Sequence, residues 1–146
     1  MVASPHAQAT AAGVEVLRAG GNAVDAAIAA NAVLAVVYPA SCGLGGDALW
    51  LVYEPRSKET IAYNGSGRAA AALDAATLRA GNHRVMPERG ALAVTVPGAV
   101  RSWEDVARRH GTRGLAELLA PAEAIAREGF VASDVVATYF ALNETV

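Results

Sequence analysis

The chain has 146 residues, and 53% of them are hydrophobic although only 5% are aromatic, so alanine and valine supply most of the apolar surface. This length is enough for one modest domain whose core consists of closely packed helices and thin strands. The formal net charge of −2 and the absence of long basic runs predict no nucleic-acid partner and no membrane-surface partner.

The chain begins with a predicted strand and a predicted helix. Met1–Ala3 reads as a short strand, and Ser4 followed by Pro5 is the cap-then-proline order that starts a helix. Apolar residues then recur near one face of that helix, at Ala9, Ala12, Val16 and Leu17.

A glycine pair separates this helix from a second one. Gly20 and Gly21 can take the left-handed backbone that ends a helix, and Asn22 is a good N-cap. Asp25 follows three residues later, where its carboxylate can reach back to the cap and meet the positive end of the helix dipole. The second helix, about Ala23–Val37, is apolar almost all round, which predicts burial on several sides.

Two strand candidates come next. Ala48–Tyr53 is a continuous apolar run, Thr60–Tyr63 is shorter, and Glu54–Ser57 between them has the composition of a turn. Together these segments predict a β-hairpin.

The second half of the chain is predicted to be mainly helical. Asp74 can cap a short helix over Ala75–Ala80, and Asn82–Gly90 reads as an exposed loop. Ala91–Val96 alternates weakly and is predicted as a strand, after which a helix runs to about Arg109. Three further helical segments complete the chain, the second of them ended by Gly129: Leu115–Leu119, Ala122–Arg127 and Ser133–Leu142.

Two glycine-rich loops are candidates for binding chemistry, and the first is Gly43–Asp47. It resembles a phosphate-binding loop only superficially, because it lacks the Lys-Ser/Thr pair and precedes a strand rather than a helix. It is either a set of backbone amides that forms an anion nest or a tight helix-to-strand turn with positive φ angles.

The second loop is Asn64–Arg68. Arg68 offers a fork of donors that suits a carboxylate, Ser66 offers a hydroxyl, and two glycines let a ligand approach the backbone. The alternative is an ordinary surface turn with a solvated arginine. Ser66 and Arg68 are therefore the candidate substrate-binding residues.

No metal site and no cofactor are predicted, because the three histidines have no ligand spacing to one another, to cysteine or to carboxylates. The single cysteine, Cys42, has no neighbouring histidine, which favours a small buried thiol over a nucleophile. The apolar run Ala26–Tyr38 is too short to cross a bilayer, and the residues after Met1 do not resemble a signal peptide. We therefore expect a cytoplasmic protein, or a periplasmic or secreted one if an upstream signal has been removed.

Several stretches of the chain, in the right order, resemble the gamma-glutamyltranspeptidase family. The strings Leu17–Ala27, Val96–Gly98 and Glu117–Phe130 are the most characteristic. The resemblance covers nearly the whole chain, through Met1–Ser4 with the first helix, Arg18–Ala27, Cys42–Tyr53, and Ala93–Val100 with Glu117–Phe130.

The resemblance implies an α+β fold that is part of the αββα sandwich of an N-terminal-nucleophile hydrolase, here mostly helices with a few strands. The family is made as one precursor that cleaves itself into a large and a small subunit. The new N-terminal threonine of the small subunit is the nucleophile, and its own amine can act as base. It attacks gamma-glutamyl amides such as glutathione, and the acyl group then passes to water or to another amine.

On this resemblance the chain is a single partial domain, residues 1–146, from the N-terminal part of the large subunit. No stretch resembles the threonine-rich cleavage motif, and Thr95, Thr138 and Thr145 are not placed to become nucleophiles. We therefore expect no catalytic residue here and no turnover by the chain alone. The implied partners are the small subunit, or the rest of the precursor, and a small gamma-glutamyl substrate.

The glycine loop departs from the family pattern. Classical members carry an arginine, followed by glutamate, that holds the α-carboxylate of the substrate. Without a gap this arginine aligns with Ser66, and with a short insertion it aligns with Arg68. The Asn64–Arg68 form is more similar to the subgroup that includes cephalosporin acylases. An acylase acting on glutaryl or other side-chain amides is thus one alternative, and a non-catalytic helical scaffold that binds a partner chain is another.

Overall fold

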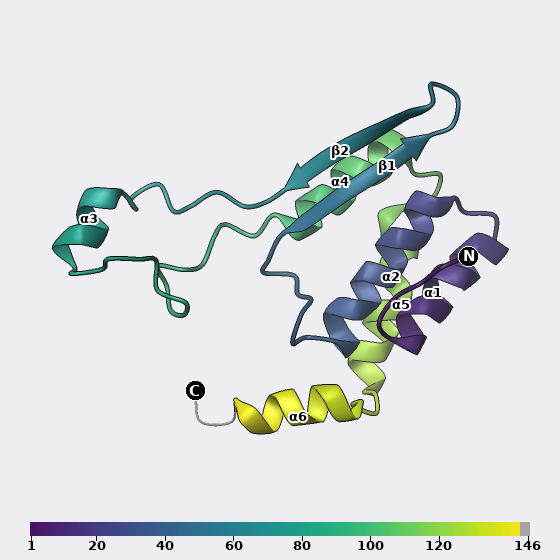
Figure 1. Cartoon of the computed structure of the whole chain (residues 1–146). Helices are drawn as coiled ribbons and strands as arrows, with labels where there is room; N and C mark the ends of the chain where they lie inside the picture. Colours follow the sequence, from purple (N-terminus) through teal and green to yellow (C-terminus); the bar gives the residue numbers. More distant parts are fainter. Residues whose placement is uncertain (144–146) are drawn as a thin grey trace. The chain divides into compact units, whose positions relative to one another are not determined.

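A computed structural model describes residues 1–143, so Thr145 lies outside the described residues. The chain divides into two compact units, which are described separately: unit 1 holds Met1–Leu44 and the chain from Ser102 onward, and unit 2 holds Gly45–Arg101. The elements in chain order (Figure 1) are α1 (Ala7–Arg18), α2 (Ala23–Val37), β1 (Ala48–Glu54), β2 (Glu59–Gly65), α3 (Ala75–Ala80), α4 (Ala99–His110), α5 (Leu115–Glu128) and α6 (Asp134–Leu142).

In unit 1 the turn between α1 and α2 is a complete helix-stop motif. The Gly20 N–H donates to the Leu17 carbonyl (3.1 Å), and the Gly21 N–H donates to the Val16 carbonyl (2.9 Å). Gly20 alone of the pair takes the left-handed backbone, with φ +86°. Gly21 is required for space instead, because a Cβ there would lie 2.7 Å from Cγ1 of Val16.

The start of α2 confirms the predicted capping box. Oδ1 of Asn22 accepts hydrogen bonds from the N–H groups of Val24 (2.9 Å) and Asp25 (3.0 Å). Oδ2 of Asp25 accepts in return from the N–H of Asn22 (2.9 Å). Each partner thus satisfies donors that would otherwise be left open at the helix terminus.

Helix α2 is buried, as its apolar sequence predicts, and it packs against both α1 and α5. A polar contact also links it to α4, since Nε1 of Trp103 donates to Oδ1 of Asn31 (2.8 Å). The buried apolar residues of unit 1 are mostly alanine and valine, with a few larger side chains among them: Ala9, Ala12, Ala26, Ile28, Ala29, Ala30, Ala32, Val33, Leu34, Val37, Trp103, Val106, Leu118, Ala122 and Val136.

Asp25 does more than cap α2, because it also holds the loop between α4 and α5. Its carboxylate accepts from the Thr112 N–H (3.0 Å), the Thr112 hydroxyl (2.6 Å) and the Arg113 N–H (3.3 Å). Nδ2 of Asn22 donates to the His110 carbonyl (2.6 Å) beside it. Burial raises the pKa of Asp25, but these hydrogen bonds, led by the Thr112 hydroxyl, outweigh it and lower the pKa overall.

Two predictions at the N-terminus are wrong. Met1–Ala3 is not a strand, and Val2 instead lies against α1, where a Cβ on Gly13 would be 2.9 Å from Cγ1 of Val2. Ser4 is not the N-cap of α1. That position belongs to His6, while the Ser4 hydroxyl donates to the His6 carbonyl (2.9 Å).

Helix α5 is one continuous helix, where the sequence predicts two segments separated at Pro121. The proline removes one backbone donor, but Leu118 before it and Ala122 after it are both buried and carry the helix through. Gly129 ends the helix as predicted, with φ +83°. Ser133 then caps α6, its hydroxyl accepting from the N–H of Val136 (3.4 Å).

Unit 2 contains the predicted hairpin. Strands β1 and β2 pair antiparallel from Ala48 opposite Gly65 to Glu54 opposite Glu59. On β1 every second side chain is exposed, and this row is apolar: Leu49 (74% exposed), Leu51 (79%) and Tyr53 (61%).

The chain after β2 carries α3 away from the hairpin and then returns to α4 (Figure 1). Asp74 caps α3 as predicted, with Oδ1 accepting from the Thr77 N–H (2.6 Å). The prediction of a strand at Ala91–Val96 is wrong. The first residues of this segment form a turn, in which the Ala93 N–H donates to the Gly90 carbonyl (3.0 Å). Six helices and one two-stranded sheet among the described residues make the chain α+β, as predicted.

Candidate functional site

Three backbone segments of unit 2 meet at the open end of the hairpin (Figure 1). They are Gly46–Asp47 before β1, Gly65–Arg68 after β2, and Val96–Ala99 at the entry to α4. The N–H groups of Gly98 and Ala99 both donate to the Gly46 carbonyl (3.1 and 3.0 Å). We call this meeting of three segments the glycine junction.

The loop that follows β2 is tied to both other segments. The Gly67 N–H donates to Oδ1 of Asp47 (2.7 Å), and the Val96 N–H donates to the Arg68 carbonyl (2.9 Å). Within the loop, the Ser66 N–H donates to Oδ1 of Asn64 (2.9 Å), which is a side-chain-closed turn. The backbone on both sides of Ser66 and Arg68 is therefore anchored.

Two glycines make this close approach possible. A Cβ on Gly67 would lie 1.7 Å from the Val96 carbonyl oxygen, and a Cβ on Gly98 would lie 2.3 Å from the Gly65 carbonyl oxygen. Neither glycine has a positive φ. Space rather than backbone conformation requires glycine at these positions.

Ser66 and Arg68 lie on the same anchored loop, and both are exposed. Among the residues that the structure describes, no side-chain hydrogen bond or ion pair engages the Arg68 guanidinium. It is therefore available to an external anion such as a carboxylate, whose geometry its planar fork matches.

Asp47 also belongs to this site, although the sequence placed it in the first glycine loop, Gly43–Asp47, and not with Ser66 and Arg68. The observed hairpin register pairs Ala48 with Gly65, and one further step places Asp47 opposite Ser66. The predicted strands, Ala48–Tyr53 and Thr60–Tyr63, define no register by themselves, so the sequence alone did not bring Asp47 to this loop.

The loop Gly43–Asp47 contains a turn between helix and strand, at Leu44 and Gly45, which was the second description proposed for it. The positive φ angles expected there are wrong, because none of its glycines has one, and the alternating backbone of an anion nest is not formed. It leads directly into β1, and its polar role here is to supply the Gly46 carbonyl and the Asp47 carboxylate to the glycine junction.

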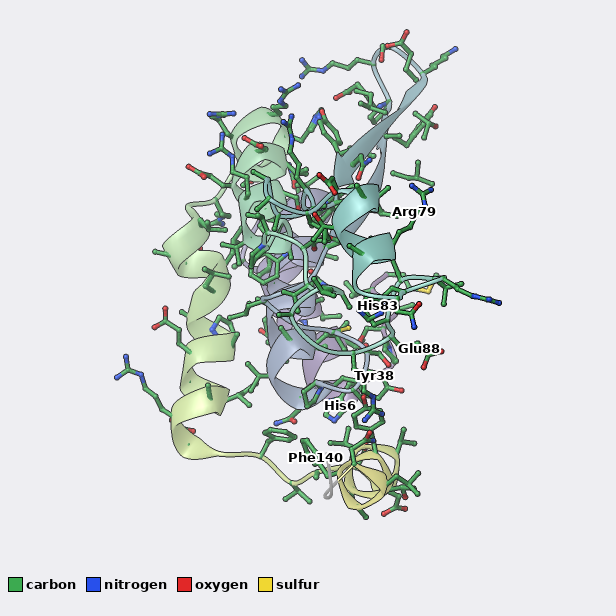
Figure 2. All side chains as sticks on the ribbon, turned by 90° about the vertical axis from the view of Figure 1, so that its left-hand side faces the viewer. His6, Tyr38, Arg79, His83, Glu88 and Phe140 are labelled. Carbon is green, nitrogen blue, oxygen red and sulfur yellow. The ribbon has the colours of Figure 1, made fainter. Side chains whose placement is uncertain are left out.

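Within residues 1–143, the remaining candidate groups do not form a second centre. Cys42 is half-buried, and burial raises the pKa of its thiol, which disfavours the reactive thiolate. Figure 2 shows His83 near the end of α3 and Glu88 on the loop beyond it. Among the described residues no three His, Cys, Asp or Glu side chains form a group that holds a metal, and no helix is long and apolar enough to span a membrane.

The family model described as Gamma-glutamyltranspeptidase matches residues 9–146 of this chain. The Glutathione hydrolase-like YwrD proenzyme of Bacillus subtilis is 45% identical over 134 residues, which are 91% of this chain and 25% of that protein. The chain thus spans about a quarter of the length of the curated relatives that it matches.

Solved structures, the following two among them, are similar along almost the whole chain. The gamma-glutamyltranspeptidase of Helicobacter pylori superimposes with a TM-score of 0.88 at 32% identity, covering 97% of this chain and 41% of that chain. The cephalosporin acylase of Bacillus halodurans gives a TM-score of 0.86 at 39% identity, covering 94% of this chain and 26% of that chain.

These likenesses confirm the expected fold class, a helix-rich α+β part of an N-terminal-nucleophile hydrolase. The family model matches 138 consecutive residues, from 9 to 146. It indicates the same family as the two similar structures. The chain therefore belongs to the gamma-glutamyltranspeptidase family.

Proposed function

We propose that this chain is the N-terminal part of the large subunit of a gamma-glutamyltranspeptidase-like enzyme. That enzyme hydrolyses gamma-glutamyl amides of the glutathione type or transfers their acyl group. The nucleophile is a threonine at the N-terminus of a small subunit released from the same precursor. The observation that carries the proposal is the glycine junction, which holds on an anchored loop an exposed arginine whose guanidinium no described residue engages.

Arg68 is the carboxylate-binding residue in this proposal. A guanidinium binds a carboxylate through two parallel hydrogen bonds, and it does so best when its backbone is held in advance. The anchors at Gly67 and at the Arg68 carbonyl provide that hold. Ser66, on the same loop, is the competing choice if the family's arginine position aligns without a gap.

The rest of the precursor is the proposed partner, and the exposed row on β1 supports it. Leu49, Leu51 and Tyr53 present a contiguous apolar face to solvent, with exposed fractions of 74%, 79% and 61%. Faces of this kind mark surfaces that another part of a protein covers. We assign the covering of this β1 face to the remainder of the precursor. The Bacillus subtilis relative is a proenzyme about four times as long as the segment that matches this chain.

The test uses the complete precursor produced from its gene, with gamma-glutamyl-p-nitroanilide as substrate. Wild-type protein should appear as two subunits on a denaturing gel and release p-nitroaniline. Arg68→Ala should raise KM by roughly tenfold or more, since a bidentate contact contributes about 1.5–3 kcal/mol. Arg68→Lys should recover only part of this loss, because lysine lacks the planar fork.

The matched variant Ser66→Ala decides between the two candidate residues. If it raises KM while Arg68→Ala leaves both KM and kcat unchanged, the ungapped alignment is correct and Arg68 is a surface residue. A wild-type precursor that neither cleaves itself nor turns over substrate would favour the scaffold over any enzyme.

An acylase is the second candidate, favoured by the cephalosporin acylase of Bacillus halodurans at 39% identity. A glutaryl amide has the same chain as a gamma-glutamyl amide but lacks the α-amino group. Comparing kcat/KM for glutaryl-p-nitroanilide and gamma-glutamyl-p-nitroanilide therefore separates the two functions. Preference for the glutaryl substrate would replace the leading proposal.

A further inference from the structure

We infer that Asp47 is a positioning residue, whose carboxylate holds the Gly67 N–H and so sets the direction in which Arg68 meets the substrate. This inference rests on the function proposed above. It assigns to Asp47 a specificity role that acts through Arg68 rather than by binding the substrate itself. Four observations on unit 2 carry it.

The first observation is the position of Asp47 in the hairpin. Ala48 pairs with Gly65 at the end of the ladder, so the next pair in register is Asp47 with Ser66. The backbone ladder ends there, and the Asp47 side chain reaches on to the Gly67 N–H instead (2.7 Å). The carboxylate thus extends the strand pairing by one residue beyond the sheet.

The second observation is that Asp47 is itself held in place. Its neighbour Gly46 accepts from the N–H groups of Gly98 and Ala99 (3.1 and 3.0 Å). On its other side, Ala48 is the first residue of β1. The carboxylate therefore projects from a fixed backbone. A side chain on a mobile loop would not hold its partner in one place.

The third observation is the spacing of the anchors. Asp47 holds the N–H of Gly67, and the Val96 N–H holds the carbonyl of Arg68 (2.9 Å). These two bonds enclose the link between Gly67 and Arg68 and fix the direction of the Arg68 Cα–Cβ bond. Without the Asp47 bond, only one end of that pair is tied.

The fourth observation is that the anchored residue is a glycine. Glycine has the widest choice of backbone conformations, so it needs an external bond to hold one of them. The crowding of Gly67 against Val96 excludes a bulkier residue that would be stiffer by itself. A carboxylate is also the strongest acceptor that a side chain offers to a backbone N–H.

The kinetic test uses the complete precursor and gamma-glutamyl-p-nitroanilide. Asp47→Ala should raise KM by roughly fivefold to tenfold and change kcat much less, because the loop moves while the nucleophile does not. Asp47→Asn should stay within about twofold of wild type, because it keeps an oxygen acceptor and loses only the charge. Glu59→Ala, which removes an exposed acid at the far end of β2, is the matched control and should leave KM unchanged.

A double-mutant cycle separates positioning from a general structural effect. If Asp47 acts through Arg68, Asp47→Ala should add nothing to KM once Arg68 is already alanine. The inference is overturned if the two effects multiply. It is also overturned if Asp47→Ala leaves KM at the wild-type value while Arg68→Ala raises it.

Hydrogen exchange of the Gly67 amide provides a readout that does not depend on activity. In the complete protein, Asp47→Ala should make this amide exchange faster, and Asp47→Asn should largely preserve its protection. Unchanged exchange in Asp47→Ala overturns the inference whatever the kinetics show. Lack of turnover by the wild-type protein, together with faster exchange in Asp47→Ala, overturns the proposed function and leaves the anchoring role of Asp47 supported.

Discussion

Replacing Asp25 by alanine tests how unit 1 is held together. The side chain is 0% exposed and accepts from the N–H groups of Asn22, Thr112 and Arg113 and from the Thr112 hydroxyl. Hydrogen bonds to a charged group contribute about 1.5–3 kcal/mol each, but donors that can turn to water recover part of this. Because Thr112 is exposed, we expect Asp25→Ala to lower the free energy of unfolding by about 3 kcal/mol rather than by the full sum.

Urea unfolding of the 146-residue chain, followed by helical circular dichroism at pH 7, measures this loss. With a slope of about 1.5 kcal/mol per molar urea, Asp25→Ala should lower the midpoint by about 2 M. Thr112→Val removes only the hydroxyl and should cost about 1 kcal/mol. Glu123→Ala removes an exposed acid from α5 and is the matched control, with an expected change below about 0.5 kcal/mol.

The pH dependence provides an independent check on the same carboxylate. The folded-state pKa of Asp25 is lowered, so its contribution is fully present above the unfolded pKa and is lost as pH falls through the folded pKa. Wild-type stability should therefore fall in the acid range below about pH 4, and Asp25→Asn should lose that part of the dependence. An Asp25→Ala chain that unfolds at the wild-type midpoint, with an unchanged acid profile, would refute the reasoning.

Two further outcomes follow from the fold and from the proposed function. Ala30→Glu should lower the free energy of unfolding by about 3 kcal/mol or more, because it puts an unpaired charge at a site that is 6% exposed. Ala27→Glu, on the exposed side of α2, should lower it little. Equal urea midpoints for the two variants would contradict the buried helix. The 146-residue chain alone should not release p-nitroaniline from gamma-glutamyl-p-nitroanilide, because the proposed nucleophile lies on the small subunit; activity that co-purifies with the chain would overturn that mechanism.

Local chemistry was enough to predict several elements of this chain. The stop at Gly20, the capping box of Asn22 and Asp25, and the cap of α3 at Asp74 all depend on residues within a few positions of one another. The nearly unbroken apolar sequence of Ala23–Val37 likewise predicted a buried helix, because such a surface is stable only away from water.

The predictions that were wrong concern structure that depends on distant neighbours. Met1–Ala3 and Ala91–Val96 have strand-like composition, but a strand exists only where another strand supplies its hydrogen bonds. The break predicted at Pro121 did not occur, because burial on both sides of the proline keeps α5 continuous. The conformational propensities of single residues do not include strand pairing or burial against distant parts of the chain.

By itself the sequence determined the family resemblance, the fold class and the two candidate residues, Ser66 and Arg68, because these follow from local strings and from side-chain chemistry. Only the tertiary structure decided how that loop is held. The bond from Gly67 to Asp47 spans 20 residues, and the bond from Thr112 to Asp25 spans 87. Contacts across such separations form only when the helices and the hairpin bring the two ends together, so their partners are decided by packing rather than by adjacent residues.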